Sequence, residues 1–108
     1  MKNKFIIVET TCPNLSKAKK LAKILITKQF AACIHFLPIT STYFWQNKIA
    51  NSKEILLRIK TTKNSYDQIE KIIIANHNYE IPQILSIEIN QGFEPYLNWI
   101  ESNLKKKK

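Results

Sequence analysis

The sequence predicts an α+β fold of the ferredoxin-like class, a βαββαβ sandwich with a long central hairpin and an extra C-terminal helix. The first observation behind this prediction is the order of hydrophobic periods, which reads strand, helix, strand, strand, helix, strand, helix. The second is that the first six elements match the split βαβ motif and obey the right-handed crossover rule. The third is size, because 108 residues, 44% of them apolar, suffice for one domain with a buried core.

The first strand and the first helix are separated by a turn. Residues 5–10 are short, apolar and rich in β-branched side chains, and the Cys-Pro-Asn sequence at 12–14 ends that pattern. From Asn14, a good N-cap residue, the apolar period becomes helical and continues to about Gln29. The predicted buried stripe consists of Leu15, Ala18, Leu21, Ala22 and Leu25.

The next two strands are predicted to form one long hairpin. Residues 31–45 read as a single strand, in which Pro38 indicates a bulge or an edge position. Residues 46–48 are the predicted turn, because Asn47 tolerates left-handed backbone, and residues 52–61 are the return strand. The first of these strands would extend roughly 50 Å, whereas a compact domain of this size is about 35 Å across. The hairpin must therefore bend at Pro38 or project beyond its own domain.

Three aromatic residues lie at the predicted tip of the hairpin: Tyr43, Phe44 and Trp45. A projecting tip of this kind would expose apolar surface and unpaired strand edges, which is unfavourable for a monomer. Aromatic side chains could also stack a ligand, but packing between subunits is the preferred interpretation. These three residues are therefore predicted to form a subunit interface.

The second half of the chain contains a helix and a strand. The Ser-Tyr-Asp-Gln sequence at 65–68 has the form of a capping box, which opens a predicted helix that ends near residues 76–78. Residues 80–89 are the predicted fourth strand. Its inward side chains are expected to be Leu85, Ile87 and Ile89, and its outward ones Ser86 and Glu88. The apolar face of the preceding helix is expected to contain Tyr66, Ile69, Ile72 and Ile73.

A short terminal helix is predicted to follow the fourth strand. Pro95 is expected to start it after Gly92, and its apolar positions are Tyr96, Trp99, Ile100 and Leu104. The predicted domain therefore covers residues 1–104. The lysine run at 105–108 is expected to be a disordered basic tail, because four adjacent like charges repel one another.

Composition excludes several classes of function. Gly92 is the only glycine, so neither a P-loop nor a dinucleotide-binding fingerprint is present. Two cysteines are too few for a disulfide scaffold or a four-cysteine zinc site. The net charge is +9, but only one of the 17 basic residues is an arginine, Arg58. Specific nucleic-acid recognition favours arginine, so no specific nucleic-acid partner is expected.

No targeting or membrane segment is expected from the hydropathy pattern. The apolar run at residues 5–8 is shorter than the roughly 7–15 residues of a signal peptide core. No window approaches the ~20 apolar residues of a membrane span. The sequence therefore predicts a soluble cytoplasmic protein with no membrane partner.

Five ordered stretches of the chain resemble the CutA divalent-cation-tolerance family. They are AACI at 31–34, YFWQNKI at 43–49, LLRIKT at 56–61, HNYEIPQI at 77–84 and YLNWI at 96–100. The resemblance covers about residues 4–104. It implies a ferredoxin-like domain assembled as a tight homotrimer through its long hairpin. It also implies a cytoplasmic protein linked to copper and other divalent metals.

The resemblance further implies a metal-binding protein without catalysis. Copper or another divalent metal is the expected ligand, no organic cofactor is expected, and an additional protein partner is left open. The alternative is a trimeric signalling protein of the PII type that binds a small molecule in clefts between subunits. An RNA-recognition motif and an acylphosphatase share the element order. An RNA-recognition motif stacks bases on aromatic residues of two central strands, but here the return strand has none and the first strand has only Phe5. An acylphosphatase needs a phosphate-binding loop after the first strand, and residues 9–14 contain neither glycine nor arginine.

The candidate metal ligands are His77 and Glu80. In some relatives copper binding has been linked to a cysteine at the end of the first strand and to two adjacent histidines. Those positions are Thr10, Asn76 and His77 here, so only one of the three ligands is retained. A structural alternative is that His77 satisfies the C-terminal end of the preceding helix.

Two other groups of residues are candidates for metal chemistry. Cys33 and His35 are two residues apart on a strand, so they share a face and could chelate a soft metal. The preferred interpretation is a buried thiol beside a hydrogen-bonded histidine. Cys12 precedes a helix N-terminus, which can lower the pKa of a thiol, but a partly exposed loop cysteine is the preferred interpretation.

Overall fold

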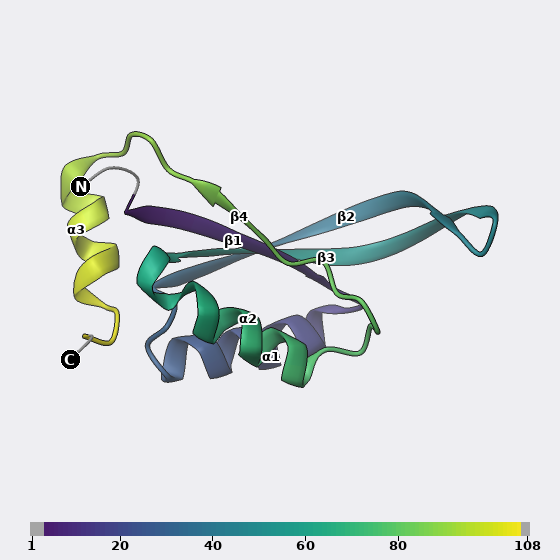
Figure 1. Cartoon of the computed structure of the whole chain (residues 1–108), viewed down its shortest axis with the longest axis horizontal. Helices are drawn as coiled ribbons and strands as arrows, with labels where there is room; N and C mark the ends of the chain where they lie inside the picture. Colours follow the sequence, from purple (N-terminus) through teal and green to yellow (C-terminus); the bar gives the residue numbers. More distant parts are fainter. Residues whose placement is uncertain (1–3, 107–108) are drawn as a thin grey trace.

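A four-stranded antiparallel sheet with two helices on one face forms the body of the protein, as the sequence predicts (Figure 1). The structure is a computed structural model that describes residues 4–106. The strand order is β2-β3-β1-β4. The elements are β1 (Phe5–Cys12), α1 (Leu15–Thr27), β2 (Cys33–Trp45), β3 (Lys48–Thr62), a 3-10 turn (Lys63–Ser65), α2 (Tyr66–Asn76), β4 (Leu85–Glu88) and α3 (Glu94–Ser102).

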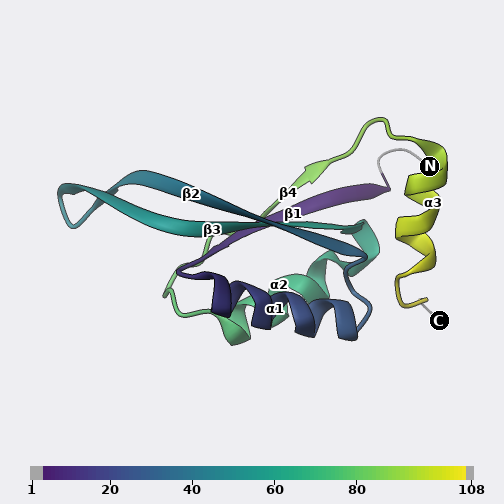
Figure 2. The same ribbon diagram turned by 180° about the vertical axis from the view of Figure 1, so that it is seen from behind.

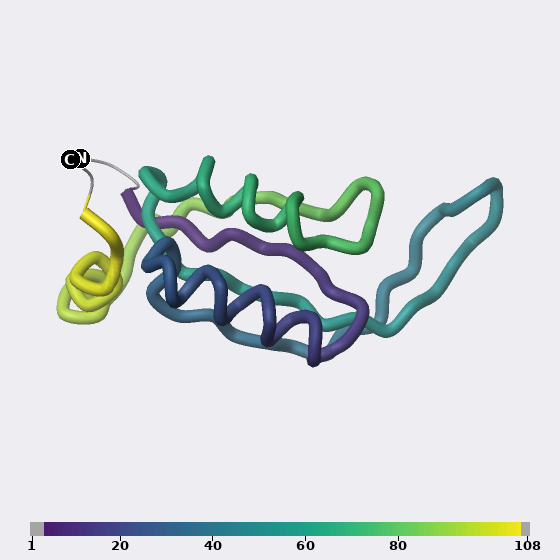
Figure 3. The backbone as a smooth tube through the Cα atoms, turned by 90° about the horizontal axis from the view of Figure 1, so that it is seen from below, coloured from purple at the N-terminus to yellow at the C-terminus, as the bar shows by residue number. Residues whose placement is uncertain are grey.

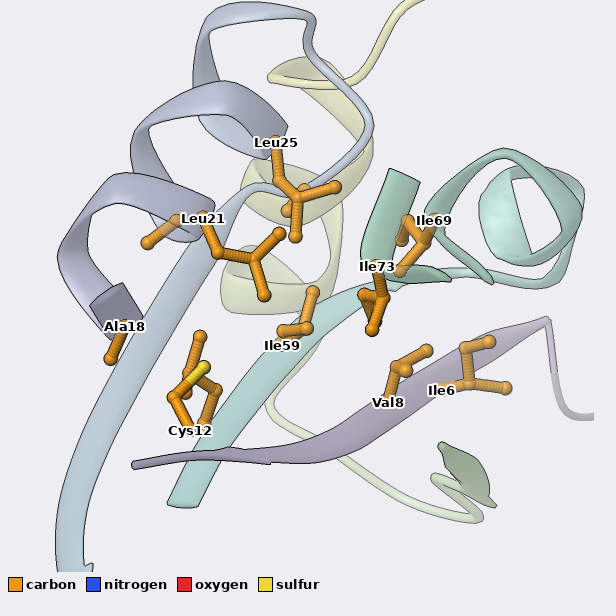
Figure 4. Close-up of a cluster of buried hydrophobic side chains, with 12 residues drawn as sticks. Ile6, Val8, Cys12, Ala18, Leu21, Leu25, Ile59, Ile69 and Ile73 are labelled. Carbon is orange, nitrogen blue, oxygen red and sulfur yellow. The ribbon is translucent and has the colours of Figure 1, made fainter. Parts of the chain in front are cut away.

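The core lies between the sheet and the layer formed by α1 and α2. Figure 4 shows the apolar side chains of both helices pointing toward those of β1 and β3. Except for Leu15, the predicted residues of these helix faces are buried or half-buried, so the predicted faces of α1 and α2 are largely confirmed. Leu15 is the first residue of α1 and stays 43% exposed. The fully buried residues in the core include Val8, Ala18, Leu25, Leu57, Ile59, Ile69 and Ile73.

The hairpin of β2 and β3 projects beyond the body of the domain. The two strands pair without interruption from Cys33 opposite Lys60 to Trp45 opposite Lys48. Pro38 is tolerated because β2 is the edge strand of the sheet. The hairpin therefore projects beyond the domain, and it also turns away from the body where it leaves it (Figure 3). The molecule measures 45 × 26 × 20 Å.

The hairpin turn has the tight, left-handed geometry that was predicted for it. Gln46 and Asn47 have φ values of 50° and 63°, which are the signs a two-residue type I′ turn needs. The turn is one residue shorter than the predicted 46–48, and β3 begins at Lys48 rather than at the predicted Ser52. Two consecutive left-handed residues match the twist of the flanking strands, so pairing continues to the tip.

The start of α1 follows the prediction and the start of α2 does not. The Asn14 side chain accepts a hydrogen bond from the Lys17 N–H at 2.9 Å, as an N-cap should. Ser65 makes no side-chain capping bond. It ends a 3-10 turn with φ −95° and ψ −5°, whereas a capping side chain requires an extended backbone. The predicted capping box is therefore wrong.

The fourth strand is shorter than expected, and its apolar side chains point to the face of the sheet opposite to the one predicted. Only Leu85–Glu88 pair with β1, and the preceding residues form a loop that contains Pro82. Ser86 lies opposite Val8, which is fully buried under the helices. Leu85 and Ile87 therefore point to the face that α1 and α2 leave uncovered and are 41% and 44% exposed. The expectation that they face the core is wrong, because alternation defines two faces but not which one the helices cover.

The terminal helix α3 packs at the end of the sheet opposite the hairpin tip (Figure 2). Ile100 and Leu104 are buried, whereas Tyr96 and Trp99 stay about 40% exposed. After the helix, the Lys105 N–H donates to the Gln29 carbonyl at 2.8 Å. The lysine tail is described only as far as residue 106, so residues 107 and 108 lie outside the described part. The division into a domain at 1–104 and a disordered tail at 105–108 stays a prediction.

Candidate functional site

One face of the sheet is left uncovered by α1 and α2, and α3 reaches it only at one end, where the Lys60 Nζ donates to the Tyr96 hydroxyl. In Figures 1 and 2, α1 and α2 both lie on the same side of the strands, and the opposite side of β2 and β3 is open. Paired residues in an antiparallel sheet share a face, so the register decides which side chains lie there. The apolar side chains on this open face that remain more than a third exposed are Leu37, Tyr43, Trp45, Leu85 and Ile87.

A cleft of about 770 Å³ lies on this face, between the hairpin and the loop that follows α2. Tyr43 and Trp45 contribute aromatic walls from β2. Glu54 from β3 and Glu80 from the loop contribute carboxylates. No lysine or arginine is among the described residues that line the cleft, although the whole chain carries a net charge of +9. The cleft is therefore acidic on a basic protein.

Glu54 is the centre of a hydrogen-bond network in this cleft. Its Oε1 accepts from the Ser41 hydroxyl at 2.7 Å, and its Oε2 accepts from the Tyr79 hydroxyl at 2.9 Å. Burial, together with this hydrogen bond to Glu54, raises the pKa of Tyr79 to about 12. The neutral phenol therefore ties the loop to β3, because only the protonated form can donate to the carboxylate.

A Tyr79→Phe variant should change how stability depends on alkaline pH. The pKa of Tyr79 rises from 10.0 to about 12 on folding, so its stabilising effect is complete below pH 10 and is lost between pH 10 and 12. Below pH 10 the variant should be about 1 kcal/mol less stable than the wild type. Denaturant unfolding at a series of pH values should show the two curves converging above pH 10. Parallel curves across this range would contradict the assignment.

His77 is the C-cap residue of α2 and links the loop to the end of β1. Its Nε2 donates to the Thr11 carbonyl at 2.5 Å, and its Nδ1 accepts from the Tyr79 N–H at 3.1 Å. The neutral tautomer with the proton on Nε2 satisfies both bonds. The His77 ring also packs against the Tyr79 ring, with 4.7 Å between the centroids. The structural alternative for His77 therefore has direct support.

The residues present fit a metal ion only in part. Within residues 4–106, no three His, Cys, Asp or Glu side chains come together. Thr10 is fully buried on the core face and its hydroxyl has no hydrogen-bond partner within that part of the chain. The Asn76 side chain donates to the Ile72 carbonyl at 2.8 Å, inside its own helix. One imidazole and the nearby Glu80 would thus form an incomplete set of ligands.

The pair of Cys33 and His35 lies on the open face of the sheet. Their register partners are Lys60 and Arg58, and Arg58 forms an ion pair with Glu9 at 3.1 Å. The prediction of a shared face is confirmed. The preferred interpretation, a buried thiol beside a hydrogen-bonded histidine, is wrong, because Cys33 is only half-buried and His35 is exposed.

Cys12 is also placed differently from the expectation. It is the last residue of β1 rather than a loop residue, and it is 4% exposed in the core. Burial, and to a lesser degree the nearby Glu54 carboxylate, raises the pKa of its thiol. A raised pKa opposes thiolate formation, so Cys12 is not an activated nucleophile.

The aromatic residues predicted as an interface lie at the exposed end of the hairpin. Tyr43, Phe44 and Trp45 are 44%, 71% and 58% exposed. Tyr43 and Trp45 share the open face with the cleft, and Phe44 points to the other side. Exposed aromatic side chains at one tip are a costly arrangement for an isolated chain.

Sequence reasoning missed Glu54, Ser41 and Tyr79 as site residues. One feature of the sequence could have identified Glu54, because it is the only acidic residue between Thr10 and Tyr66. A single carboxylate in a long basic and apolar stretch is unusual enough to mark a specific partner. Its partner Tyr79 is 25 residues away in the sequence, and no local pattern connects the two.

A protein-family model described as CutA1 divalent ion tolerance protein matches residues 6–103 of the chain. This covers all seven of the helices and strands from β1 to α3, apart from one residue of β1. The match supports the resemblance that was stated from five short stretches. It does not favour the PII-type alternative.

Curated relatives give the same description. The chain is 34% identical over 98 residues to the divalent-cation tolerance protein CutA of Thermus thermophilus, which covers 90% of this chain and 95% of the relative. It is 36% identical over 91 residues to mouse protein CutA and 34% identical over 101 residues to a chloroplastic protein CutA of Arabidopsis thaliana. Those matches cover 83% and 93% of this chain. The chain spans only 51% and 56% of the length of these two relatives.

Solved structures share the fold. The CutA1 crystal structure from Oryza sativa matches with a TM-score of 0.93 and 33% identity, over 98% of each chain. The periplasmic divalent cation tolerance protein CutA from Archaeoglobus fulgidus matches with a TM-score of 0.91 and 31% identity, over 94% of this chain and 99% of the other. No helix among residues 4–106 meets the length and apolarity needed to cross a bilayer.

The predicted cytoplasmic location is wrong in the light of these relatives. The similar structure from Archaeoglobus fulgidus is described as periplasmic, and the relative from Arabidopsis thaliana is described as chloroplastic. The prediction relied on the composition of a single domain and on a short apolar run near its start. A domain of this fold occurs in more than one compartment, so neither feature decides where it works.

Proposed function

The chain belongs to the CutA1 divalent ion tolerance protein family, and from this membership we propose that it is a homotrimer that takes part in the response to divalent metal ions by binding them without catalysis. The observation that carries the proposal is the acidic cleft beside His77. It places Glu54 and Glu80 together on a chain with twice as many basic as acidic residues. Cations are the ligands that such a surface attracts.

The open face of the sheet supports assembly into a trimer. Its exposed apolar residues and the aromatic hairpin tip are continuous along β2, which is also an edge strand with unpaired backbone groups. Pairing with a second subunit would satisfy those groups and cover the apolar side chains. The hairpin extends beyond its own domain and can therefore reach a neighbouring one.

The proposed metal ligands are Nδ1 of His77 and the carboxylate of Glu80. In the neutral tautomer Nδ1 carries a lone pair, which now accepts the 3.1 Å bond from the Tyr79 N–H. A metal would have to replace that bond, so we propose a weak site that water or a second subunit completes. Imidazole nitrogen suits copper and zinc, and a bound ion would supply a positive charge to the acidic cleft.

Calorimetric titration with Cu(II), Cu(I) and Zn(II) tests this proposal on the untagged chain. His77→Ala should weaken binding at least tenfold, because it removes the only imidazole near Glu80. Wild-type affinity should also fall in acid, since a protonated imidazole cannot coordinate a metal. His35→Ala is the matched control and should leave binding unchanged, because His35 lies elsewhere on the open face of the sheet. Equal affinity in the wild type and His77→Ala would overturn the metal site.

A further inference from the structure

The outward face of α1 is rich in lysine, and Leu15 and Ile26 are its exposed apolar residues. The apolar stripe of this helix, including Ala18, Leu21 and Leu25, is buried against the sheet. The opposite side carries lysines, and all of them are exposed. We call this surface the α1 basic face, and it consists of Lys17, Lys19, Lys20, Lys23 and Lys28.

These five charges are not neutralised by neighbouring side chains. No acidic residue occurs anywhere from Thr10 to Lys53 in the sequence. Within residues 4–106, the ion pairs involve Lys4, Arg58 and Lys63, which all lie outside α1. The α1 basic face therefore presents five of the 17 basic residues of the chain on one helix of 13 residues and its C-cap.

A general excess of lysine does not account for this concentration. The neighbouring helix α2 lies beside α1 in the same layer and also has a solvent-exposed side (Figure 3). It carries Asp67, Glu70 and a single lysine, Lys71. A compositional bias alone would have placed lysines on both helices, so the charge is specific to α1.

We propose that the α1 basic face binds the phosphate backbone of duplex nucleic acid without reading its sequence. Lysine contacts phosphate as a flexible point charge, and such contacts position a protein without distinguishing bases. No arginine or aromatic residue occurs between Leu15 and Lys28, so the face has no group suited to reading guanine or stacking on bases. The expectation that no specific nucleic-acid partner exists is consistent with this binding mode.

An anionic membrane fits the same face less well. Peripheral helices that bind membranes insert an apolar face beneath their basic residues. Most of the apolar face of α1 is buried in the core of the domain, and only Leu15 and Ile26 remain exposed for insertion. A duplex needs only the charges, and a helix of 13 residues is about 20 Å long, which matches about six base pairs.

The face remains available in the proposed trimer. The helices cover one side of the sheet, whereas the surface assigned to subunit contact lies on the other side and at the hairpin tip (Figure 2). Three copies of the α1 basic face in one assembly would increase avidity for a long polyanion. The inference does not depend on the metal site, which lies in the cleft on the open side.

The test is fluorescence anisotropy of a labelled mixed-sequence DNA duplex with the full chain, at a series of NaCl concentrations. Lys20→Gln/Lys23→Gln should weaken binding at least tenfold at low salt. It should also reduce the slope of log K against log salt by about two, since each phosphate contact contributes about 0.9. The matched control is Lys53→Gln/Lys71→Gln, which removes the same charge from exposed positions outside α1. The decrease in log K for this control should be less than half of the decrease for the α1 variant.

Two results would overturn the inference. Equal losses in the two double variants would show attraction by total charge rather than by this face. Binding to vesicles of phosphatidylserine and phosphatidylcholine that exceeds binding to the duplex, and that the α1 variant abolishes, would assign the face to lipid. Circular dichroism should be unchanged in both variants, because the substituted side chains are exposed. If the chain binds the duplex but no metal, the proposed function is contradicted and the inference about the α1 basic face stands.

Discussion

Light scattering of the purified chain should give about three times the chain mass of 12.7 kDa, with no monomer at micromolar concentration. The physical reason is the hairpin, which projects from the body and exposes Tyr43, Phe44 and Trp45. An isolated chain would leave this surface and the edge strand β2 in water. Folding and association should then be linked, so the unfolding midpoint should rise with protein concentration. A stable monodisperse monomer would contradict the trimer.

Trp45→Ala should be the most damaging single change to assembly. Trp45 is 58% exposed in the isolated chain, and burying so large an aromatic side chain in a subunit contact contributes about 3–5 kcal/mol. The variant should dissociate at concentrations where the wild type stays trimeric, as measured by sedimentation equilibrium. Phe93→Ala is the control, because Phe93 is 75% exposed at the other end of the molecule. A Trp45→Ala trimer of unchanged stability would contradict the interface.

His77→Ala should destabilise the fold even when no metal is present. The substitution removes the donor to the Thr11 carbonyl and the acceptor of the Tyr79 N–H, and leaves two backbone groups without partners. An unsatisfied buried polar group costs about 1–3 kcal/mol, so a loss of about 2 kcal/mol is expected. Denaturant unfolding in the presence of a chelator measures this loss without any contribution from metal.

The matched control for this measurement is His35→Ala. His35 is exposed on the open face of the sheet, so its removal should change the free energy of unfolding by less than about 0.5 kcal/mol. Equal stability of the wild type and His77→Ala would show that the two hydrogen bonds contribute nothing in solution. Together with the titration experiment, the comparison separates a structural role of His77 from a role in metal binding.

Local patterns in the sequence were enough to predict the element order. The change from alternating to helical apolar spacing after Asn14 marked the first strand and helix correctly. Asn47 predicted the left-handed turn, and the length of the hairpin strands predicted that they would bend or project. These features depend on residues close together in the chain, where backbone preference and periodicity act directly.

The candidate site was predicted only at its edge. His77 was identified through a family resemblance and Glu80 as its neighbour in the sequence, and both lie in the segment after α2 that borders the cleft. The Glu54 network was not predicted, because its hydrogen bonds join residues from two strands and a loop. The bond from His77 to the Thr11 carbonyl spans 66 residues. Contacts over such separations leave no periodic signal in the sequence.

The sequence by itself determined the order of helices and strands, the fold class and the family of this protein. Only the tertiary structure decided which face of the sheet the helices cover, and this placed Leu85 and Ile87 outside and Cys12 inside. The alternation of a strand is symmetric with respect to its two faces, so periodicity cannot make that choice. The helices make it when they pack, because burying their own apolar stripes on one side leaves the other side of the sheet open.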